Sequence, residues 1–330
     1  MKYKVVRLAV IFDQVLSAGG GYQQALNISI SMYKFKERKS YSLKFFTIYS
    51  ENIPILSGYG IDVELIKISK FNRAWLKVRS LIYSDHILKN IQKYVGLNKF
   101  EKSLIDKDID LVYFLSPSSW SNYLEKLNYI ITVWDLCHRD MPEFPEVYEN
   151  RVFERREVGF NRSLTRAIAV IVDSKLGKDN IIRRYMVDES RIHILPFSPA
   201  LSIQNVKQKS SVSIKDKFKI LGDYIFYPAQ FWAHKNHAYI LQGLTALKDE
   251  YNIKISAVFS GGDAGNLSYI KSLVDELDLT DQVHFLGFVD NADIVTLYEN
   301  SIALVMPTYF GPTNIPPLEA FTLGTPVLYS

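Results

Sequence analysis

The chain has 330 residues, of which 48% are hydrophobic and 22% are charged, and its formal net charge is +4. This length supports two hydrophobic cores, and this polarity excludes a membrane bundle. Its single cysteine, Cys137, excludes an intrachain disulfide and favours a reducing cytoplasm. The small net charge and the lack of a recognition motif argue against a nucleic-acid partner.

The N-terminal segment predicts a strand rather than a secretion signal. Residues 5–12 are apolar except for Arg7, and no small-residue cleavage site follows them. The triple glycine at 19–21 then predicts a loop, and residues 22–33 predict a helix. Glycines after a strand let a ligand approach the backbone closely, although glycine-rich loops are common and the signal alone is weak.

Strands and helices continue to alternate through the first 200 residues, which predicts a doubly wound parallel sheet. The further strands predicted in this half are 44–49, 63–66, 110–115, 129–134, 168–172 and 191–195. Asp106, Asp108 and Asp110 resemble an acidic metal-binding motif, but their position before a strand favours a solvated turn.

Basic residues far outnumber acidic ones between residues 67 and 102. Within this segment, Lys77 and Arg79 follow Trp75 closely. Such a basic stretch with an aromatic side chain could lie on anionic lipid headgroups, or it could be the solvated face of a helix. Under the first hypothesis this surface brings the protein to a membrane. Charge reversal at Lys77 and Arg79 would then abolish membrane association.

Polar residues crowd just past the strand predicted at 129–134, where ligands of doubly wound sheets bind. Asp135 or His138 could contact a substrate hydroxyl there, and His138 could exchange a proton near neutral pH. Either residue could instead anchor the loop through hydrogen bonds.

The polar, lysine-rich stretch 201–218 predicts a linker, so we expect domains at 1–200 and 219–330. The second domain has predicted strands at 223–229, 254–260, 283–286, 301–306 and 326–329, with helices between them.

Two strand ends in this second domain suit an anion. Lys235 is predicted at the N-terminus of the helix that follows strand 223–229, where a cation opposes the helix dipole by about 0.3–1 kcal/mol. A bound anion explains that placement, and a solvated lysine is the alternative. After strand 301–306, the free amides of residues 313–315 would open a second helix. Glu319, predicted in its first turn, could bind a ligand or complement the dipole.

Four segments carry a resemblance to a known family. They are Tyr-Pro-Ala-Gln-Phe-Trp-Ala-His-Lys-Asn-His at 227–237, Ser-Gly-Gly-Asp at 260–263, Leu-Gly-Phe-Val at 286–289 and Gly-Pro-Thr-Asn-Ile-Pro-Pro-Leu-Glu-Ala at 311–320. In order and spacing they resemble the donor half of retaining glycosyltransferases of family four, the group 1 type. The resemblance is specific over 220–330 and weaker over the first 200 residues. It implies a GT-B fold, an α/β architecture of two Rossmann-like domains facing across a cleft.

The resemblance also implies roles for individual residues. Lys235 would hold the donor diphosphate, the amides of 313–315 would contact it, and Glu319 would bind the ribose hydroxyls. The glycine loop would face the donor's phosphate and sugar, and residues 286–289 its base. The candidate donor-binding residues are Gly20, Gly21, Gln230, Gly262, Phe288, Val289, Gly311, Thr313, Asn314, Ile315 and Glu319. The candidate catalytic residues are Lys235, Glu319, Asp135 and His138.

The chain departs from the family pattern at two positions. The family usually has a second glutamate eight residues before Glu319 and an arginine near the start of the lysine loop, but this chain has Gly311 and Gln230 there. The first change suggests a donor that lacks a hydroxyl, such as the deoxysugar rhamnose. Family members also normally continue beyond the strand that ends this chain at Ser330, so we expect a truncated or atypical ending.

The implied reaction moves a sugar from a nucleoside-diphosphate sugar to a hydroxyl of a saccharide or lipid-linked saccharide acceptor, with retention. The expected setting is cell-surface polysaccharide synthesis, with a mannosyl or rhamnosyl donor, no metal and no cofactor. The chain is expected in the cytoplasm, at the inner face of the membrane if the basic segment binds lipid. Two alternatives stay open: a nucleotide-sugar epimerase of the same fold, and a degenerate transferase without catalysis.

Overall fold

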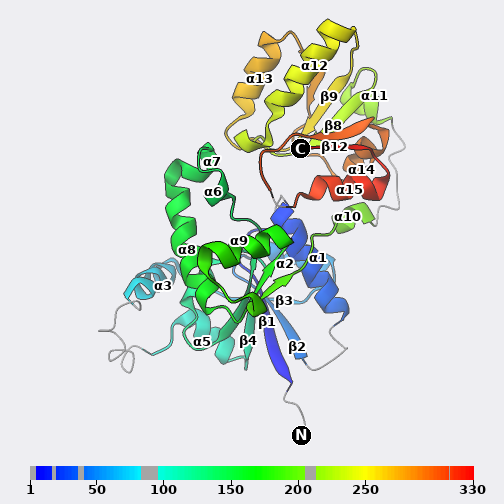
Figure 1. Cartoon of the computed structure of the whole chain (residues 1–330). Coiled ribbons are helices and arrows are strands. Elements are labelled where there is room, and N and C mark those ends of the chain that lie inside the picture. The colour runs from blue at the N-terminus through cyan, green and yellow to red at the C-terminus, as the bar shows by residue number, and fades with distance from the viewer. Residues whose placement is uncertain (1–4, 17–19, 36–40, 83–95, 205–212, 312) are drawn as a thin grey trace. The chain divides into compact units, whose positions relative to one another are not determined.

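The computed structural model describes the chain except residues 1–4, 17–19, 36–40, 83–95, 205–212 and 312. The chain divides into two compact units (Figure 1). The first unit comprises Met1–Leu136 and Glu154–Pro196, and the second comprises Cys137–Phe153 and Phe197–Ser330. Each unit contains one parallel sheet, with seven described strands in the first and five in the second.

In the first unit the strands are ordered β3-β2-β1-β4-β5-β6-β7. They are β1 (Val6–Phe12), β2 (Tyr41–Thr47), β3 (Val63–Leu65), β4 (Leu111–Phe114), β5 (Asn128–Val133), β6 (Ala169–Val172) and β7 (Ile192–Ile194). Each lies within a few residues of its predicted range. The order changes direction between β1 and β4, and the carboxyl ends beside such a switch point are where doubly wound sheets bind ligands.

Helices cover both faces of this sheet, each face with its own buried apolar cluster. They are α1 (Gly20–Lys34), α2 (Asn52–Gly58), α3 (Lys70–Ile82), α5 (Lys99–Ile105), α8 (Val152–Arg166) and α9 (Lys175–Tyr185), with short 3₁₀ turns η3 (Ser119–Tyr123) and η5 (Glu189–Arg191). The prediction that Gly20 and Gly21 belong to a loop is wrong, because both lie in the first turn of α1. A Cβ at Gly21 would overlap the ring of Trp134, so a glycine lets the helix start pack on that ring.

In the second unit the strands are ordered β10-β9-β8-β11-β12, all parallel. They are β8 (Tyr224–Pro228), β9 (Ser256–Ser260), β10 (Val283–Phe285), β11 (Ala303–Met306) and β12 (Val327–Tyr329). The direction changes between β8 and β11. Fully buried aromatic residues fix β8 at the centre, because Tyr224, Phe226 and Tyr227 are all 0% exposed.

The second unit's helices lie along the same chain segments that the sequence predicts, with additional short ones. They are α6 (Cys137–Asp140), α7 (Pro145–Tyr148), α10 (Leu201–Gln204), α11 (Ile214–Phe218), α12 (His237–Tyr251), α13 (Leu267–Glu276), α14 (Asn291–Asn300) and α15 (Ile315–Leu323), with 3₁₀ turns η4 (Glu149–Arg151) and η6 (Ala233–Lys235). Two features differ from the predicted domain ranges. Residues 137–153 group with the second unit, and the described parts of 201–218 are helical.

The acidic segment before β4 forms a turn, as expected. Asp108 has a positive φ of 61°, and Asp110 accepts a hydrogen bond from Nε of Arg7 at 2.9 Å. Across the described residues, no group of three or more His, Cys, Asp or Glu side chains is placed to hold a metal ion. The described helices also include none that is both long and apolar enough to cross a bilayer.

Candidate functional site

Two loops of the second unit meet at the carboxyl ends of adjacent strands. β8 and β11 are hydrogen-bonded neighbours, so the two strand ends that suit an anion lie side by side. The lysine loop (residues 229–236) leads from β8 into α12, and the α15 loop (residues 307–314) leads from β11 into α15. The amide of Tyr309 donates to the carbonyl of His234 at 2.9 Å, so the two loops are joined through their backbones.

A side-chain hydrogen bond also joins the loops. Nζ of Lys235 donates to Oδ1 of Asn314 at 3.1 Å. The backbone of Lys235 is also held in place, because the hydroxyl of the buried Tyr227 donates a hydrogen bond to its carbonyl at 3.0 Å. An ammonium group is therefore held beside the N-terminus of α15, where a helix favours negative charge.

Glycine at position 311 has a steric explanation. Gly311 has a φ of +126°, which side-chain-bearing residues rarely adopt. A Cβ there would lie 2.8 Å from Nδ2 and 2.9 Å from Oδ1 of Asn314. Nδ2 of Asn314 donates to the carbonyl of Gly311 at 3.2 Å and to the hydroxyl of Tyr329 at 2.9 Å. The amide of Asn314 thus fills the space in which a side chain at 311 would begin.

The start of α15 leaves backbone donors for a ligand. The helix begins at Ile315, and Asn314 is its N-cap without making a side-chain capping bond. Within the described chain, no group accepts a hydrogen bond from the amides of Thr313, Asn314 or Ile315. Ile315 is the first helical residue, so helix geometry leaves its amide unpaired, and the amides of Thr313 and Asn314 come directly before it. All three are close to Lys235, which is hydrogen-bonded to Asn314.

Glu319 lies deeper in α15 than predicted. It is the fifth residue of the helix, so the interpretation that it complements the dipole from the first turn is wrong. Its Oε2 accepts a hydrogen bond from the hydroxyl of Tyr298 at 3.0 Å. Burial raises the pKa of Glu319, while hydrogen bonds from Tyr298 and from the amide of Ala200 lower it. The carboxyl is thus oriented by two donors in a poorly solvated place.

The remaining candidates of this unit follow β8, β9 and β10 at the same edge of the sheet. The carbonyl of Gly262 accepts from the amide of Phe231 at 3.0 Å, and a Cβ at Gly262 would lie 3.0 Å from the ring of Phe288. The Phe288 ring is largely exposed, beside Val289. Oε1 of Gln230 accepts from the indole of Trp232 at 3.0 Å, so it serves the loop itself.

At the first unit's switch point lies Asp13, which the sequence interpretation missed. It follows β1 directly, is buried, and accepts a hydrogen bond from Oγ of Ser116 at 2.7 Å. Burial raises the pKa of Asp13, and hydrogen bonds from Ser118 and Ser116 lower it. A small pocket of about 40 Å³ lies here, lined by Asp13, Gly21 and Trp134 among others. One feature of the sequence could have identified Asp13: it is an acidic residue between a predicted strand and the triple glycine.

Asp135 and His138 have structural partners. Oδ1 of Asp135 accepts from the guanidinium of Arg156 at 2.5 Å, and its carbonyl accepts from the same group at 3.0 Å. The side chain of His138 is 0% exposed, and its ring lies edge-on to Phe153 at 5.6 Å. This burial favours the anchoring role of His138 over proton exchange with a substrate.

A second feature absent from the prediction supports the lysine loop. Glu146, from α7, accepts a hydrogen bond from the amide of His234 at 3.0 Å and pairs with its Nδ1. The ring of His234 stacks on Phe310 of the α15 loop, with 3.8 Å between centroids and 12° between planes. Segment 137–153 is therefore packed on both loops of the site.

Helix α3 carries part of the predicted basic surface. Phe71, Trp75 and Val78, spaced along one face, are 79%, 44% and 45% exposed. Lys77 is exposed, but Arg79 is only 6% exposed and forms a salt bridge of 2.7 Å with Glu125. The expectation that Arg79 belongs to an exposed basic surface is wrong, because the buried carboxylate of Glu125 draws it inward.

Comparison with known proteins agrees with the motifs. Residues 212–330 match the family model of the glycosyl transferases group 1, which confirms the resemblance for that part of the chain. The O-antigen chain mannosyltransferase RfbU of Salmonella typhimurium is 27% identical over 187 residues, which are 57% of this chain and 48% of RfbU. The chain thus spans about half the length of this relative.

Two solved structures share the fold. The Anabaena protein Alr3699/HepE, in complex with UDP-glucose, has a TM-score of 0.67 at 14% identity, over 98% of this chain and 80% of that one. WaaG, a glycosyltransferase involved in lipopolysaccharide biosynthesis, has a TM-score of 0.63 at 14% identity, over 98% of this chain and 80% of WaaG. The predicted fold class, α/β with the two doubly wound sheets of the GT-B type, is confirmed.

Proposed function

We propose that this chain, which carries a group 1 glycosyltransferase domain at residues 212–330, transfers a sugar from a nucleoside-diphosphate sugar to an acceptor hydroxyl. The observation that carries the proposal is the pairing of Lys235 with Asn314, which holds a cation beside the amides that open α15. A diphosphate is the anion that this combination suits. The name of RfbU and the UDP-glucose in the HepE structure support this donor class and a role in cell-surface polysaccharide synthesis.

The proposed chemistry rests on positioning and charge. The bond between the anomeric carbon and the diphosphate breaks, and a bond to the acceptor oxygen forms on the same face of the sugar. Lys235 and the amides of Thr313 and Ile315 stabilise the charge that grows on the leaving diphosphate. That diphosphate takes the acceptor's proton on the face from which it leaves. The acceptor oxygen therefore attacks from the same face, and the configuration at the anomeric carbon is retained. The reaction so written requires neither a resident cofactor nor a metal.

Glu319 is the proposed partner of the ribose hydroxyls. Its hydrogen bonds from Tyr298 and Ala200 hold the carboxyl in one orientation, as recognition of a diol requires. Phe288, exposed at the end of β10, is the proposed contact for the base.

For the donor sugar we propose mannose or a deoxyhexose such as rhamnose. Mannose is proposed from the name of RfbU. A deoxyhexose is proposed from position 311, which provides no carboxylate because the amide of Asn314 fills that space. A panel of sugar nucleotides tests this assignment: mannosyl or rhamnosyl donors should turn over best. Faster turnover of glucose or galactose donors would contradict it.

The proposed acceptor is a saccharide or lipid-linked saccharide, contacted at the first unit's switch point. Asp13 lies in the small pocket there beside Gly21, and Asp135 lies at the end of the neighbouring β5, fixed by Arg156. Asp13 is the better candidate for a hydroxyl contact, because its own partners are hydroxyl groups.

We further propose that α3 lies on the inner face of the cell membrane, where the acceptor is built. The exposed stripe of Phe71, Trp75 and Val78 would enter the interface, and Lys70 and Lys77 would meet anionic headgroups. The replacement Trp75→Ser should weaken flotation with anionic vesicles, whereas Tyr251→Ser, at a more exposed aromatic residue of the second unit, should not. Equal flotation of both variants with the wild type would refute this contact.

One experiment tests the reaction itself. Purified protein is incubated with sugar nucleotides, with and without saccharide acceptors, and the products are identified. Sugar transfer that requires Lys235 supports the proposal. Conversion of the sugar nucleotide without an acceptor would mean an epimerase, and nucleotide binding without turnover would mean a degenerate transferase.

A further inference from the structure

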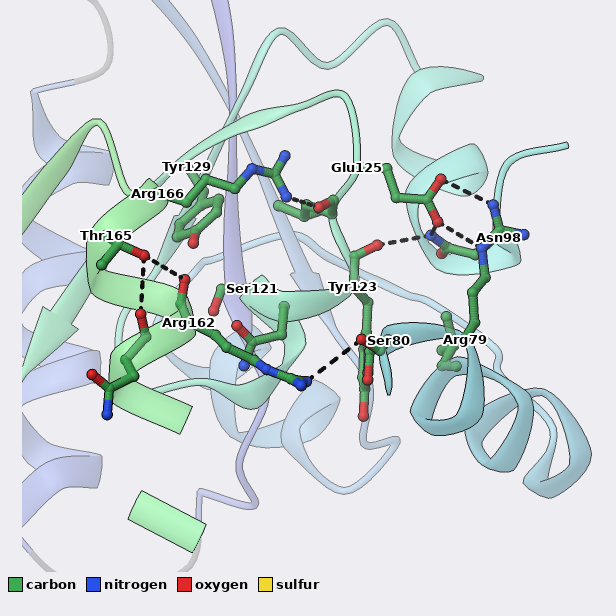
Figure 2. Close-up of a pocket in the computed structure, with 14 residues that line it drawn as sticks. Arg79, Ser80, Asn98, Ser121, Tyr123, Glu125, Tyr129, Arg162, Thr165 and Arg166 are labelled. Atoms are coloured by element: carbon green, nitrogen blue, oxygen red, sulfur yellow. Dashed lines mark hydrogen bonds and ion pairs between the residues drawn. The ribbon is translucent and has the colours of Figure 1, made fainter. Parts of the chain in front are cut away.

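The first unit contains a pocket of about 520 Å³ that none of the predicted site residues lines (Figure 2). Its wall comes from the end of α3, the residues before α5, η3 with the segment after it, and the last turns of α8. Glu125 and Arg166, both in this wall, each lie three residues before a strand, β5 and β6 respectively. The pocket therefore lies at the amino ends of the strands, whereas Asp13 and Asp135 follow the carboxyl ends.

The lining carries an excess of positive charge. Arg79, Arg162 and Arg166 line the pocket, and Glu125 is the one carboxylate among its described lining residues. Nε and Nη2 of Arg79 donate to the two oxygens of Glu125 at 2.7 and 2.9 Å. Because this bidentate pair neutralises Glu125, the charges of Arg162 and Arg166 are left uncompensated within the described lining.

Arg162 is the side chain that points to a ligand. Figure 2 shows its guanidinium directed toward Ser80, and its one hydrogen bond within the described residues is long, 3.5 Å from Nη1 to the Ser80 carbonyl. A guanidinium has five N–H donors, so most of its hydrogen-bonding capacity remains for another partner. Arg166 donates to the carbonyl of Leu124 and lies over the ring of Tyr129, which keeps its charge at the pocket wall.

We propose that this pocket binds a phosphate-bearing molecule, with Arg162 as the principal contact. The planar fork of arginine matches phosphate oxygens in a bidentate way, and the charge balance favours an anion. Small-molecule pockets measure about 300–1,000 Å³, so this one holds a phosphate together with a group of sugar or glycerol size. The phosphate belongs either to a lipid headgroup or to a soluble ester. A lipid is one of the two sources because α3, which forms one wall of the pocket, also carries the exposed apolar stripe.

The test compares Arg162→Gln with Arg155→Gln, which removes the same charge from an exposed position of the same helix that does not line the pocket. Both are made in a Lys235→Ala background, so that phosphate binding at the donor site does not contribute. Titration with glycerol 1-phosphate should show saturable binding that Arg162→Gln weakens at least about 10-fold and Arg155→Gln leaves unchanged. No saturable binding, or equal affinity of the two variants, would overturn the proposal.

Vesicles containing phosphatidylglycerol distinguish the two phosphate sources. Flotation reduced by Arg162→Gln but not by Arg155→Gln supports a lipid headgroup, and unchanged flotation with weakened glycerol phosphate binding supports a soluble ester. If Arg162→Gln lowers the melting temperature without ligand, Arg162→Lys is used instead. It keeps the charge and loses the fork, so its affinity for glycerol phosphate should also fall. The result is independent of whether the protein transfers sugars.

Discussion

The two switch points of this protein share a topology and differ in chemistry. Beyond β8 and β11 the second unit holds an ammonium, that of Lys235, beside the amides that open α15. Beyond β1 and β4 the first unit holds a buried carboxyl, that of Asp13, among serine hydroxyls. The parallel sheet thus decides where a site lies, and the residues just past each strand decide what it binds. One edge suits an anion and the other suits hydroxyl groups.

Loss of the cation should have the largest effect. Lys235→Ala should lower turnover by about 100-fold or more, because removal of one charge-stabilising donor commonly costs about 2.7–4 kcal/mol. The assay is sugar transfer at saturating donor, with Lys254→Ala, an exposed lysine before β9, as the control. Activity of Lys235→Ala within a few-fold of the wild type would remove the main difference between the two edges.

A side chain at position 311 should disturb the anion edge through Asn314. Gly311→Ala places a residue at a φ of +126° and brings its Cβ to 2.8 Å from Asn314, so we expect a loss of about 1–3 kcal/mol in donor binding or stability. When Gly311→Ala is made in a protein that already carries Asn314→Gly, the loss of free energy should be smaller, because the clash is gone and only the backbone strain remains. Additive effects in this double-mutant cycle would show that Asn314 does not act on position 311.

Removal of the Asp13 carboxylate, at the sheet edge beyond β1 and β4, should lower the activity of the protein and leave its stability unchanged. Asp13→Asn should lower transfer by about 10-fold or more, if this carboxyl contacts the acceptor. Burial raises the pKa of Asp13, so its ionised form is unfavourable in the fold and stability is lost as pH rises through that pKa. The variant should therefore keep its melting temperature at pH 8. A lower melting temperature with normal transfer would make Asp13 a structural residue.

Beneath the lysine loop, replacement of His237 should have the smallest effect on sugar transfer and should appear as a change in the pH dependence of stability. Burial and then the charge of Lys235 lower the pKa of His237 to about 3. Below about pH 6.5 the unfolded chain binds a proton there that the folded chain excludes, so the free energy of unfolding falls by up to about 1.4 kcal/mol per pH unit. His237→Gln should remove this contribution between pH 6.5 and 4, and replacement of the exposed His193 should not. Identical pH profiles would contradict the neutral, buried state.

Features with a local signal were predictable from the sequence. The strands are short apolar runs, and the lysine and α15 loops follow two of them, so their meeting at one sheet edge could be inferred before the structure. Gly324 ends α15 with a φ of 75°, as a glycine after a helix predicts.

Features that depend on distant partners were not predictable. Arg79 is buried because Glu125, 46 residues away, pairs with it, and Glu146 supports His234 across 88 residues. Gly21 has room only for a glycine because the ring of Trp134, a residue distant in the sequence, packs against it. Composition and spacing contain none of these contacts. Asp13 is a different case, because its position directly after the first strand was a local signal that the sequence interpretation did not use.

The most direct test of the central claim, an anion site at the edge of β8 and β11, is thermal stability with UDP, GDP, dTDP, CMP and their sugars. A ligand at 100 times its dissociation constant stabilises a protein by about 2.7 kcal/mol. We predict selective stabilisation of the wild type by one nucleoside diphosphate and its sugar, and a much smaller shift for Lys235→Ala. No shift with any nucleotide on folded protein, or an equal shift in the variant, would contradict the assignment.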